Sequence, residues 1–342
     1  MKIRDIFLLF IVSGPLYANS LNRVAINENF ITSQAFNFFV TGHMYGMANK
    51  KTPFPSGTIL ANIENINAES GLFFISLGDI YDIQNKTSIT NFKKSFLSKI
   101  EMPVYNAVGN HDVVDRKMYL DAFNLKSTFY YLKHKNSLFV FLDTELNDGK
   151  IIGNQKEFFQ NILLNEANLA KNIFIFTHRI FWKKKYSSVL PFRMSARRVE
   201  FNQDNKISKL INKLTTRDNN VYVFSGDVGQ EHLLPLMYHK DKHVHYMAIG
   251  NSDSVSDALL NIKINNLDEV QVEIMPMVEV KGKKIKSYRE YEIDKNNYYM
   301  TNLKDMSLIE KIFYFLKYPY FSALLFSIFI FILGYKLRSY RG

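Results

Sequence analysis

The stretch "VYNAVGNHDVVD", residues 104–115, decides the fold class. It is mostly apolar up to Gly109 and then continues with the polar residues Asn110, His111 and Asp112. A short apolar run that ends at a glycine is typical of a strand buried inside an α/β protein. Polar side chains directly after such a strand lie at its carboxyl end, where α/β proteins bind ligands. The sequence therefore predicts an α/β fold with a functional site at this strand end.

Apolar runs and helical patterns alternate through the central part of the chain. Strands are predicted at residues 36–43, 71–79, 102–112, 171–179 and 220–227, together with a hairpin over 127–145 that turns at Lys135 and Asn136. Helices are predicted at residues 58–70, 88–101, 155–169 and 206–214. Alternating apolar and polar residues from about His243 to Ile293 predict a terminal β-sheet. Because strands buried on both faces need cover on both sides, we expect a central layer flanked by helices.

Five of the predicted strands end in residues that could bind a metal ion or lie next to one. These endings are "TGH" (41–43), "GDIYD" (78–82), "GNHD" (109–112), "TH" (177–178) and "SGDVG" (225–229). Loops at the carboxyl ends of strands lie along one edge of an α/β layer, so side chains far apart in sequence can converge there. The chain has no cysteine, so a metal ion at this edge would have only oxygen and imidazole ligands.

The ordered set of strand endings resembles the calcineurin-like metallophosphoesterase family over roughly residues 36–250. The resemblance implies a four-layered α/β/β/α sandwich with divalent metal ions, Mn, Fe or Zn, at the strand ends. It implies that Asp79 bridges two metal ions, that His43 binds the first, and that Asn110 and His178 bind the second.

The same resemblance implies a hydrolase. His111 would approach the leaving group as an acid or a transition-state stabiliser, and Asp112 lies beside it in the motif. Attack by metal-bound hydroxide would cleave a phosphomonoester or phosphodiester, because a bound divalent ion can turn water into a nucleophile near neutral pH.

The sequence departs from the family pattern at the first metal ion. Where the family has Asp-x-His, this chain has Thr41 before Gly42 and His43, and where the family usually ends in Gly-His-x-His, this chain has Asp227 and Gly229 instead of the two histidines. Asp227 can still offer oxygen to the second metal ion.

The two metal sites should therefore differ in strength. The first keeps His43 and the shared Asp79 unless Glu231 or His232 contributes, so we expect it to bind weakly or not at all, because divalent ions normally need at least three protein ligands. The second keeps four ligands, and the chain should hold one or two ions.

Each candidate residue also has a structural interpretation. Asp79 and Asp82 could cap a following helix. His178 could be a structural histidine, and His43 and Asp227 could be turn residues. A chain that had lost its chemistry in this way would be a binding or assembly partner in envelope polysaccharide or lipid processing.

The two ends of the chain predict export and anchoring. Residues 1–20 place Lys2 and Arg4 before a short apolar run, which is typical of a secretory signal, with a retained anchor as the alternative. Residues 318–335 are uncharged and apolar and predict a transmembrane helix, with a buried core helix as the alternative.

The predicted plan is thus a signal peptide (1–20), a phosphoesterase-like domain (21–293), a linker (294–317), a single membrane span (318–335) and a cytoplasmic tail (336–342). Positive charge after the span places the tail inside the cell and the domain outside the cytoplasm, on the periplasmic side of a bacterial inner membrane.

The formal net charge is +11, and residues 179–198 carry seven Lys or Arg and no acidic residue. For an exported protein, this basic stretch favours anionic lipid or a phosphorylated substrate over nucleic acid, which we do not expect as a partner. A solvated loop is the alternative interpretation of the same residues.

Overall fold

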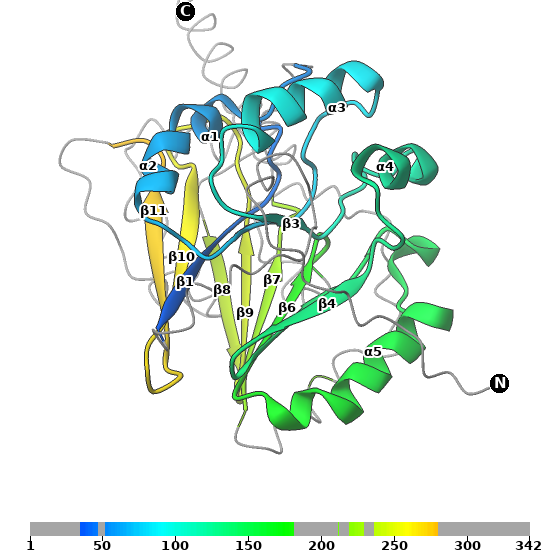
Figure 1. Cartoon of the computed structure of the whole chain (residues 1–342), viewed down its shortest axis with the longest axis vertical. Coiled ribbons are helices and arrows are strands. Elements are labelled where there is room, and N and C mark those ends of the chain that lie inside the picture. Colours follow the sequence, from blue (N-terminus) through cyan, green and yellow to red (C-terminus); the bar gives the residue numbers. More distant parts are fainter. Residues whose placement is uncertain (1–34, 47–51, 181–210, 212–218, 229–235, 280–342) are drawn as a thin grey trace, which may run out of the picture. The chain divides into compact units, whose positions relative to one another are not determined.

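The computed structural model describes residues 35–46, 52–180, 211, 219–228 and 236–279 (Figure 1). The chain divides into two compact units, residues 1–292 and 293–342, and all described residues belong to the first. The predicted signal peptide, linker, membrane span and tail lie outside the described residues, and so does the predicted helix at 206–214, apart from Ile211. In the ranges that are described, no helix is long and apolar enough to cross a membrane.

The first sheet has five strands in the order β11-β10-β1-β2-β3. Its members are β1 (Phe36–Thr41), β2 (Phe74–Ser76), β3 (Val104–Asn106), β10 (Ala258–Ile264) and β11 (Val270–Pro276). β1, β2 and β3 run parallel, whereas β10 pairs antiparallel with both β1 and β11. The three strands that carry predicted ligands therefore point the same way and end at the same edge.

The second sheet has six strands in the order β4-β5-β6-β7-β9-β8. They are β4 (Tyr130–His134), β5 (Ser137–Phe141), β6 (Asn172–Thr177), β7 (Asn220–Ser225), β8 (Leu236–Asp241) and β9 (Val244–Ile249). The β4–β5 hairpin turns at Lys135 and Asn136, as predicted. The prediction of a terminal β-sheet from about residue 243 is wrong. β9 pairs with β7 in this sheet, whereas β10 pairs with β1 in the other.

The two sheets pack face to face around an aromatic core. Phe38 and Val40 of β1 belong to this core, while Phe39 between them faces the helices, as the two-residue period of a strand requires. The ring of Phe38 lies 5.1 Å from that of Phe174 in β6 and 5.3 Å from that of Phe139 in β5. Burial of these rings holds the two sheets together.

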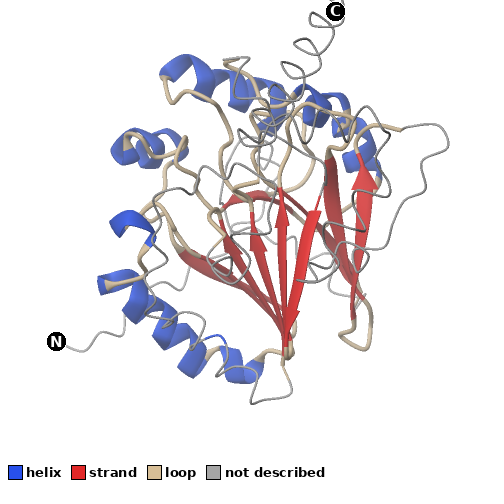
Figure 2. Ribbon diagram, turned by 180° about the vertical axis from the view of Figure 1, so that it is seen from behind, coloured by secondary structure: helices blue, strands red, loops and turns tan. Residues whose placement is uncertain are grey.

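Helices cover the outer face of the five-stranded sheet (Figures 1 and 2). They are α1 (Gly57–Ala61), α2 (Ile63–Ala68), α3 (Lys86–Phe92), which continues as a π-helical turn (Lys93–Leu97), and α4 (Arg116–Phe123). The predicted helix at 58–70 is interrupted at Asn62. The sequence did not predict α4, whose first turn is capped by the Asp115 side chain accepting from Met118 N at 2.9 Å.

A further helix, α5 (Gly153–Asn165), lies along the six-stranded sheet beside β4 (Figure 1). Its Phe158 ring contacts Phe129 and, in β4, Tyr131. Short 3-10 turns flank it at Asn147–Gly149 and Ala167–Leu169. The described residues thus form a mixed α/β fold with two packed sheets, and the predicted fourth layer is represented among them by α5.

Candidate metal centre

The ends of strands from both sheets meet at one edge of the sandwich. In the first sheet, Leu77 N donates to Thr41 O at 2.8 Å and Tyr45 N donates to Asp79 O at 3.0 Å. Across the sheets, His178 Nδ1 donates to Leu77 O at 2.7 Å. The loops after β1, β2 and β6 are therefore in direct contact, which the sequence predicted from the direction of parallel strands.

Glycines allow this close approach. A Cβ atom on Gly226, after β7, would lie 2.2 Å from the carbonyl oxygen of Leu77, after β2. A Cβ atom on Gly109 would lie 2.2 Å from Asp79 Oδ1. Contacts this short are forbidden, so Gly226 lets the two sheets approach each other, while Gly109 lets the loops after β2 and β3 of the first sheet approach each other.

Asp79 lies at the centre of this edge. It is 1% exposed and has a left-handed backbone, with φ of 58°. Its Oδ2 lies 3.4 Å from His178 Nε2 and 3.9 Å from His43 Nε2, and its Oδ1 accepts a 3.1 Å hydrogen bond from His111 N. The carboxylate is therefore shared among three of the predicted strand endings.

Both buried imidazoles are oriented in the same way. His43 Nδ1 donates to Asn251 O at 3.0 Å, and His178 Nδ1 donates to Leu77 O. A backbone carbonyl that accepts from Nδ1 fixes the tautomer and leaves Nε2 available as a ligand. In each case Nε2 is the atom that faces Asp79.

One more predicted ligand, Asp227, lies next to His178. Asp227 Oδ1 is 3.9 Å from His178 Nε2. Asn110 Oδ1 and His178 Nε2 are buried and have no hydrogen-bond partner among the described residues. Buried polar atoms normally have a partner. A cation bound at His178 Nε2, beside Asp79 and Asp227, would supply such a partner, so the residues present fit a divalent metal ion.

The arrangement is nevertheless not a closed metal site. Within the described ranges, no three His, Asp or Glu side chains converge closely enough to hold a metal ion by themselves. Donor atoms on one first-row metal ion lie roughly 3 to 3.5 Å apart. The 3.4 Å separation of Asp79 and His178 fits this range, whereas the 3.9 Å separations of Asp79 from His43 and of His178 from Asp227 exceed it.

Charge interactions tie these groups together. Burial lowers the pKa of His178, but the carboxylates of Asp79 and Asp227 outweigh it and raise the pKa to about 9. Burial raises the pKa of Asp79, but the imidazoles of His178, His111 and His43 outweigh it and hold the pKa below its usual range. Burial lowers the pKa of His43, against the opposing effect of Asp79 and Asp227. The opposite pKa shifts of Asp79 and His178 reflect the attraction between their charges across 3.4 Å.

Asp112, predicted beside the catalytic histidine, lies behind Asp79 instead of facing the opening. Its side chain is fully buried, and its carboxylate accepts hydrogen bonds from Gly109 N at 2.8 Å, Ile80 N at 2.8 Å and Asp79 N at 3.0 Å. Asn106 Nδ2 donates to it at 3.1 Å. Asp112 therefore positions the loops that carry Asp79 and His111.

His111 is the predicted site residue at the surface. Its side chain is 28% exposed, its Nδ1 donates to the carbonyl oxygen of Asp82, and its ring centroid is 4.8 Å from that of Tyr45. It can therefore reach a group that binds over Asp79. The helix-cap interpretation of Asp79 and Asp82 is wrong, because the cap of α3 is Asn85, whose side chain accepts from Ser88 N at 2.8 Å.

The missing first-metal carboxylate is not replaced within the described residues. Thr41, which stands in its place, is fully buried, donates to Ala258 O at 3.3 Å and accepts from Asn251 Nδ2 at 2.8 Å. The Thr41 hydroxyl is thus used in hydrogen bonds to Ala258 and Asn251. Gly229, Glu231 and His232 lie outside the described residues.

Two features of the site were not predicted. Asn251 holds the loop after β1, since its main-chain oxygen accepts from His43 and its side chain bonds Thr41 and Gly42 O. Glu145 forms a two-pronged ion pair with Arg179, the residue after His178. Arg179 begins the basic stretch in the sequence, but no sequence signal marks Glu145 as its partner. The rest of that stretch, 181–198, lies outside the described residues.

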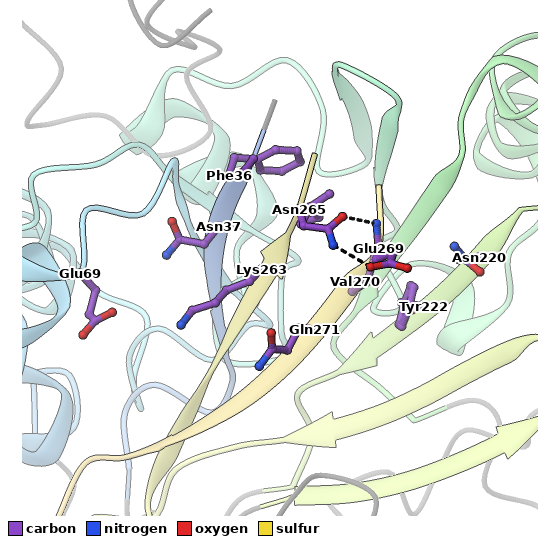
Figure 3. A pocket seen from close by; sticks show the side chains of 12 residues that line it. Phe36, Asn37, Glu69, Asn220, Tyr222, Lys263, Asn265, Glu269, Val270 and Gln271 are labelled. Carbon is purple, nitrogen blue, oxygen red and sulfur yellow. Dashed lines mark hydrogen bonds between the residues drawn. The ribbon is translucent and has the colours of Figure 1, made fainter. Parts of the chain in front are cut away.

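A separate cavity of about 850 Å³ lies at the opposite end of β1 (Figure 3). Its lining includes Phe36 and Asn37 at the start of β1, Asn220 at the start of β7, and Lys263 near the end of β10. Within it, Asn265 Nδ2 donates to Glu269 Oε2 at 2.7 Å. None of its lining residues is a predicted metal ligand, so this cavity is distinct from the candidate metal centre.

No protein-family model and no curated protein matches this sequence, but solved structures resemble the chain. A purple acid phosphatase from seeds of yellow lupin, Lupinus luteus, is 10% identical with a TM-score of 0.49, over 75% of this chain and 53% of that one. A protein described as a 5′-nucleotidase from Staphylococcus aureus is 14% identical with a TM-score of 0.45, over 79% and 58%. A predicted phosphoesterase from Streptococcus pneumoniae is 9% identical with a TM-score of 0.32, over 74% and 98%.

The three are described as a phosphatase, a protein assigned as a nucleotidase and a predicted phosphoesterase. This chain spans little more than half the length of the first two. Because the TM-scores lie below 0.5 and the identities below 15%, the geometry of the site has to carry the functional conclusion.

Proposed function

We propose that the protein is a metal-dependent phosphoesterase that hydrolyses a phosphomonoester or phosphodiester. One observation carries this proposal. Asp79 Oδ2 faces the Nε2 atoms of His178 and His43 at 3.4 and 3.9 Å, and both imidazoles are held through Nδ1 by backbone carbonyls. A shared carboxylate with two pre-oriented imidazoles is a donor set that suits Mn, Fe or Zn.

The residues of the site would have three roles: metal binding, proton donation and positioning of the Asp79 loop. Asp79, Asn110, His178 and Asp227 would hold one divalent ion, and His43 with Asp79 would hold a second, weaker one. A bound divalent ion supplies Lewis acidity and lowers the pKa of water. His111, partly exposed beside Asp79, would give a proton to the leaving oxygen, with its ring held by the Asp82 carbonyl and by Tyr45. Asp112 would keep the Asp79 loop in place.

The cellular setting is part of the proposal and rests on the sequence alone. An apolar leader at 1–20 and an uncharged apolar segment at 318–335 support an anchored, single-pass protein with its domain on the extracytoplasmic side. Its substrate would then be a phosphorylated, lipid-linked or envelope-associated compound.

A second function is favoured by one observation. Thr41 is buried where the family has a ligand, and no complete three-ligand group exists within the described ranges. A chain with these features could instead be a catalytically inactive binding or assembly partner in envelope polysaccharide or lipid processing.

Metal binding and hydrolysis separate the two functions. The full-length chain, purified in a nonionic detergent, is freed of metal, given Mn, Fe or Zn separately, and assayed for bound metal and for hydrolysis of an aryl phosphate monoester and diester. An enzyme should hydrolyse one of them only with metal, and His111→Ala should lower the rate about 100-fold or more. The exposed His243→Ala is the matched control and should leave the rate unchanged. Failure of the parent chain to bind any of the three metals would favour the inactive partner.

A further inference from the structure

Arg179 and Glu145 form a partly buried ion pair beside the candidate metal centre. Arg179 Nε donates to Glu145 Oε1 at 2.6 Å, and Nη2 donates to Oε2, so the two planar groups meet in a fork. The side chains are 16% and 5% exposed. Such two-pronged pairs fix the orientation of a guanidinium far better than a single contact does.

The main chain fixes both members of the pair next to the metal ligands. Arg179 directly follows His178, and its N–H donates to Thr144 Oγ1 at 3.0 Å. Glu145 N donates to Asp143 Oδ1 at 2.8 Å, and that carboxylate also accepts from Thr128 and Arg116. The pair is thus anchored at the ends of β5 and β6, on the side of the site where His178 and Asp227 lie.

The charges of the same pair interact with those of the candidate ligands. Burial lowers the pKa of Arg179, but Glu145, and after it Asp227 and Asp79, outweigh this effect and raise it. Burial raises the pKa of Glu145, against the opposing effect of Arg179 and His178.

The pair leaves part of the guanidinium available. An arginine has five N–H donors, and Glu145 takes two of them. In the described part of the chain no other residue accepts from this guanidinium. The Arg179 side chain is 16% exposed, so part of it borders solvent. A fixed arginine fork with spare donors beside the candidate metal centre matches the oxygens of a phosphoryl group.

We propose that Arg179 binds the phosphoryl group of the substrate and that Glu145 positions it. The inference rests on the proposed phosphoesterase function and adds to it the group that recognises the substrate's anionic oxygens. Glu145 offsets the charge of Arg179 while the fork holds the guanidinium in one orientation.

Binding of inorganic phosphate tests the inference without turnover. Phosphate is titrated calorimetrically into the full-length chain in detergent, metal-free and with Mn, for the parent and for Arg179→Gln, Arg179→Lys and Glu145→Gln. Lys263→Gln is the control, since Lys263 forms an ion pair with Glu273 near the other end of β1. Far-ultraviolet circular dichroism of each variant checks folding, and Arg179→Lys keeps the test valid if the glutamine variant does not fold.

Arg179→Gln should raise the dissociation constant of phosphate about 10- to 100-fold, because charge-assisted hydrogen bonds are lost. Arg179→Lys should raise it about 5-fold or more, because lysine lacks the fork. Glu145→Gln should raise it less, and Lys263→Gln should not change it. With an ester that is hydrolysed, Arg179→Lys should raise KM more than it lowers kcat.

Two outcomes would overturn the inference about Arg179: a folded Arg179 variant that binds phosphate as the parent does, or a parent chain that binds no phosphate with or without Mn. Tighter phosphate binding by Glu145→Gln would show that Glu145 competes with the anion, and would overturn its positioning role. A chain that binds phosphate through Arg179 but hydrolyses no ester would contradict the proposed function and leave this inference standing.

Discussion

The carboxylate of Asp112 accepts a 3.0 Å hydrogen bond from the backbone N–H of Asp79. Asp79 has a φ of 58°, a conformation that costs a non-glycine residue free energy. The same carboxylate also accepts hydrogen bonds from Ile80 N, next to Asp79, and from Gly109 N in the "GNHD" loop. Asp112 therefore compensates the strain that turns the Asp79 side chain toward His178 and His43.

Replacing Asp112 by alanine should destabilise the protein by at least about 2 kcal/mol, because buried N–H donors would lose their acceptor. It should also reduce metal binding, since the Asp79 loop would lose its support. Urea unfolding followed by circular dichroism measures the first effect, and metal stoichiometry measures the second.

The matched control for Asp112→Ala is Asp121→Ala. The Asp121 side chain is 64% exposed and pairs with Lys117 on the surface of α4. Its loss should change the free energy of unfolding by no more than about 0.5 kcal/mol. Equal effects of the two substitutions would contradict the role given to Asp112.

The two imidazoles should contribute unequally to metal binding. His178 lies next to both Asp79 and Asp227, whereas His43 has Asp79 as its candidate co-ligand and a buried Thr41 where the family has a carboxylate. His178→Gln should therefore abolish tight metal binding, while His43→Gln should remove at most a second, weaker ion. Elemental analysis after dialysis measures the number of metal ions bound by each variant, and a variant of the exposed His243, His243→Gln, is the control. Loss of all metal from His43→Gln alone would show that the first site is the stronger one.

Gly226→Ala should destabilise the fold strongly. The added Cβ would lie 2.2 Å from Leu77 O, in the backbone of the opposite sheet, so the two sheets would have to separate. We expect a loss of about 2 kcal/mol or more in the free energy of unfolding. Gly57→Ala is the control. Its Cβ would meet Asp253 at 3.7 Å, an ordinary contact at the start of α1, so this change should be neutral or slightly stabilising.

His134 should make stability depend on pH. Burial, with a smaller contribution from Lys135, lowers its pKa from 6.5 to about 4. Between these values the unfolded chain binds a proton that the folded chain does not, so this contribution is present above pH about 6.5 and is lost as pH falls toward about 4. His134→Gln should flatten the pH dependence of urea unfolding in this window relative to the parent. A parallel profile for His134→Gln and the parent would exclude this role, and His243→Gln serves as the comparison.

The polar strand endings were readable from the sequence because they are local. An apolar run that stops at a glycine predicts a strand end, and parallel strands place such ends at one edge. The strand ends thus predict from the sequence alone that His43, Asp79, His178 and Asp227 lie at one edge of the fold. It did not reveal that Asp112 faces away from the opening, because a carboxylate that binds metal and one that binds amides look alike in a sequence.

The pairing of the last strands depended on the tertiary structure. The stretch from His243 onward shows the alternation of strands, which fixes the element type but not the partner. β9 joins the second sheet and β10 the first because partners are chosen by contacts between residues far apart in the chain, such as Phe36 with Ile264 and Val221 with Val244. Export, anchoring and the membrane helix remain predictions from the two ends of the sequence.

By itself, then, the sequence determined the strands, the glycine turns after them and the candidate ligand types, because these follow from local pattern and residue chemistry. Three contacts follow only from the tertiary structure. The Thr41 hydroxyl donates a hydrogen bond to Ala258 O, and Glu145 forms an ion pair with Arg179. Asp79 lies between the oriented imidazoles of His43 and His178. The physical reason is that hydrogen-bond partners and ion pairs of buried groups are set by packing between distant segments, which leaves no periodic trace in the chain.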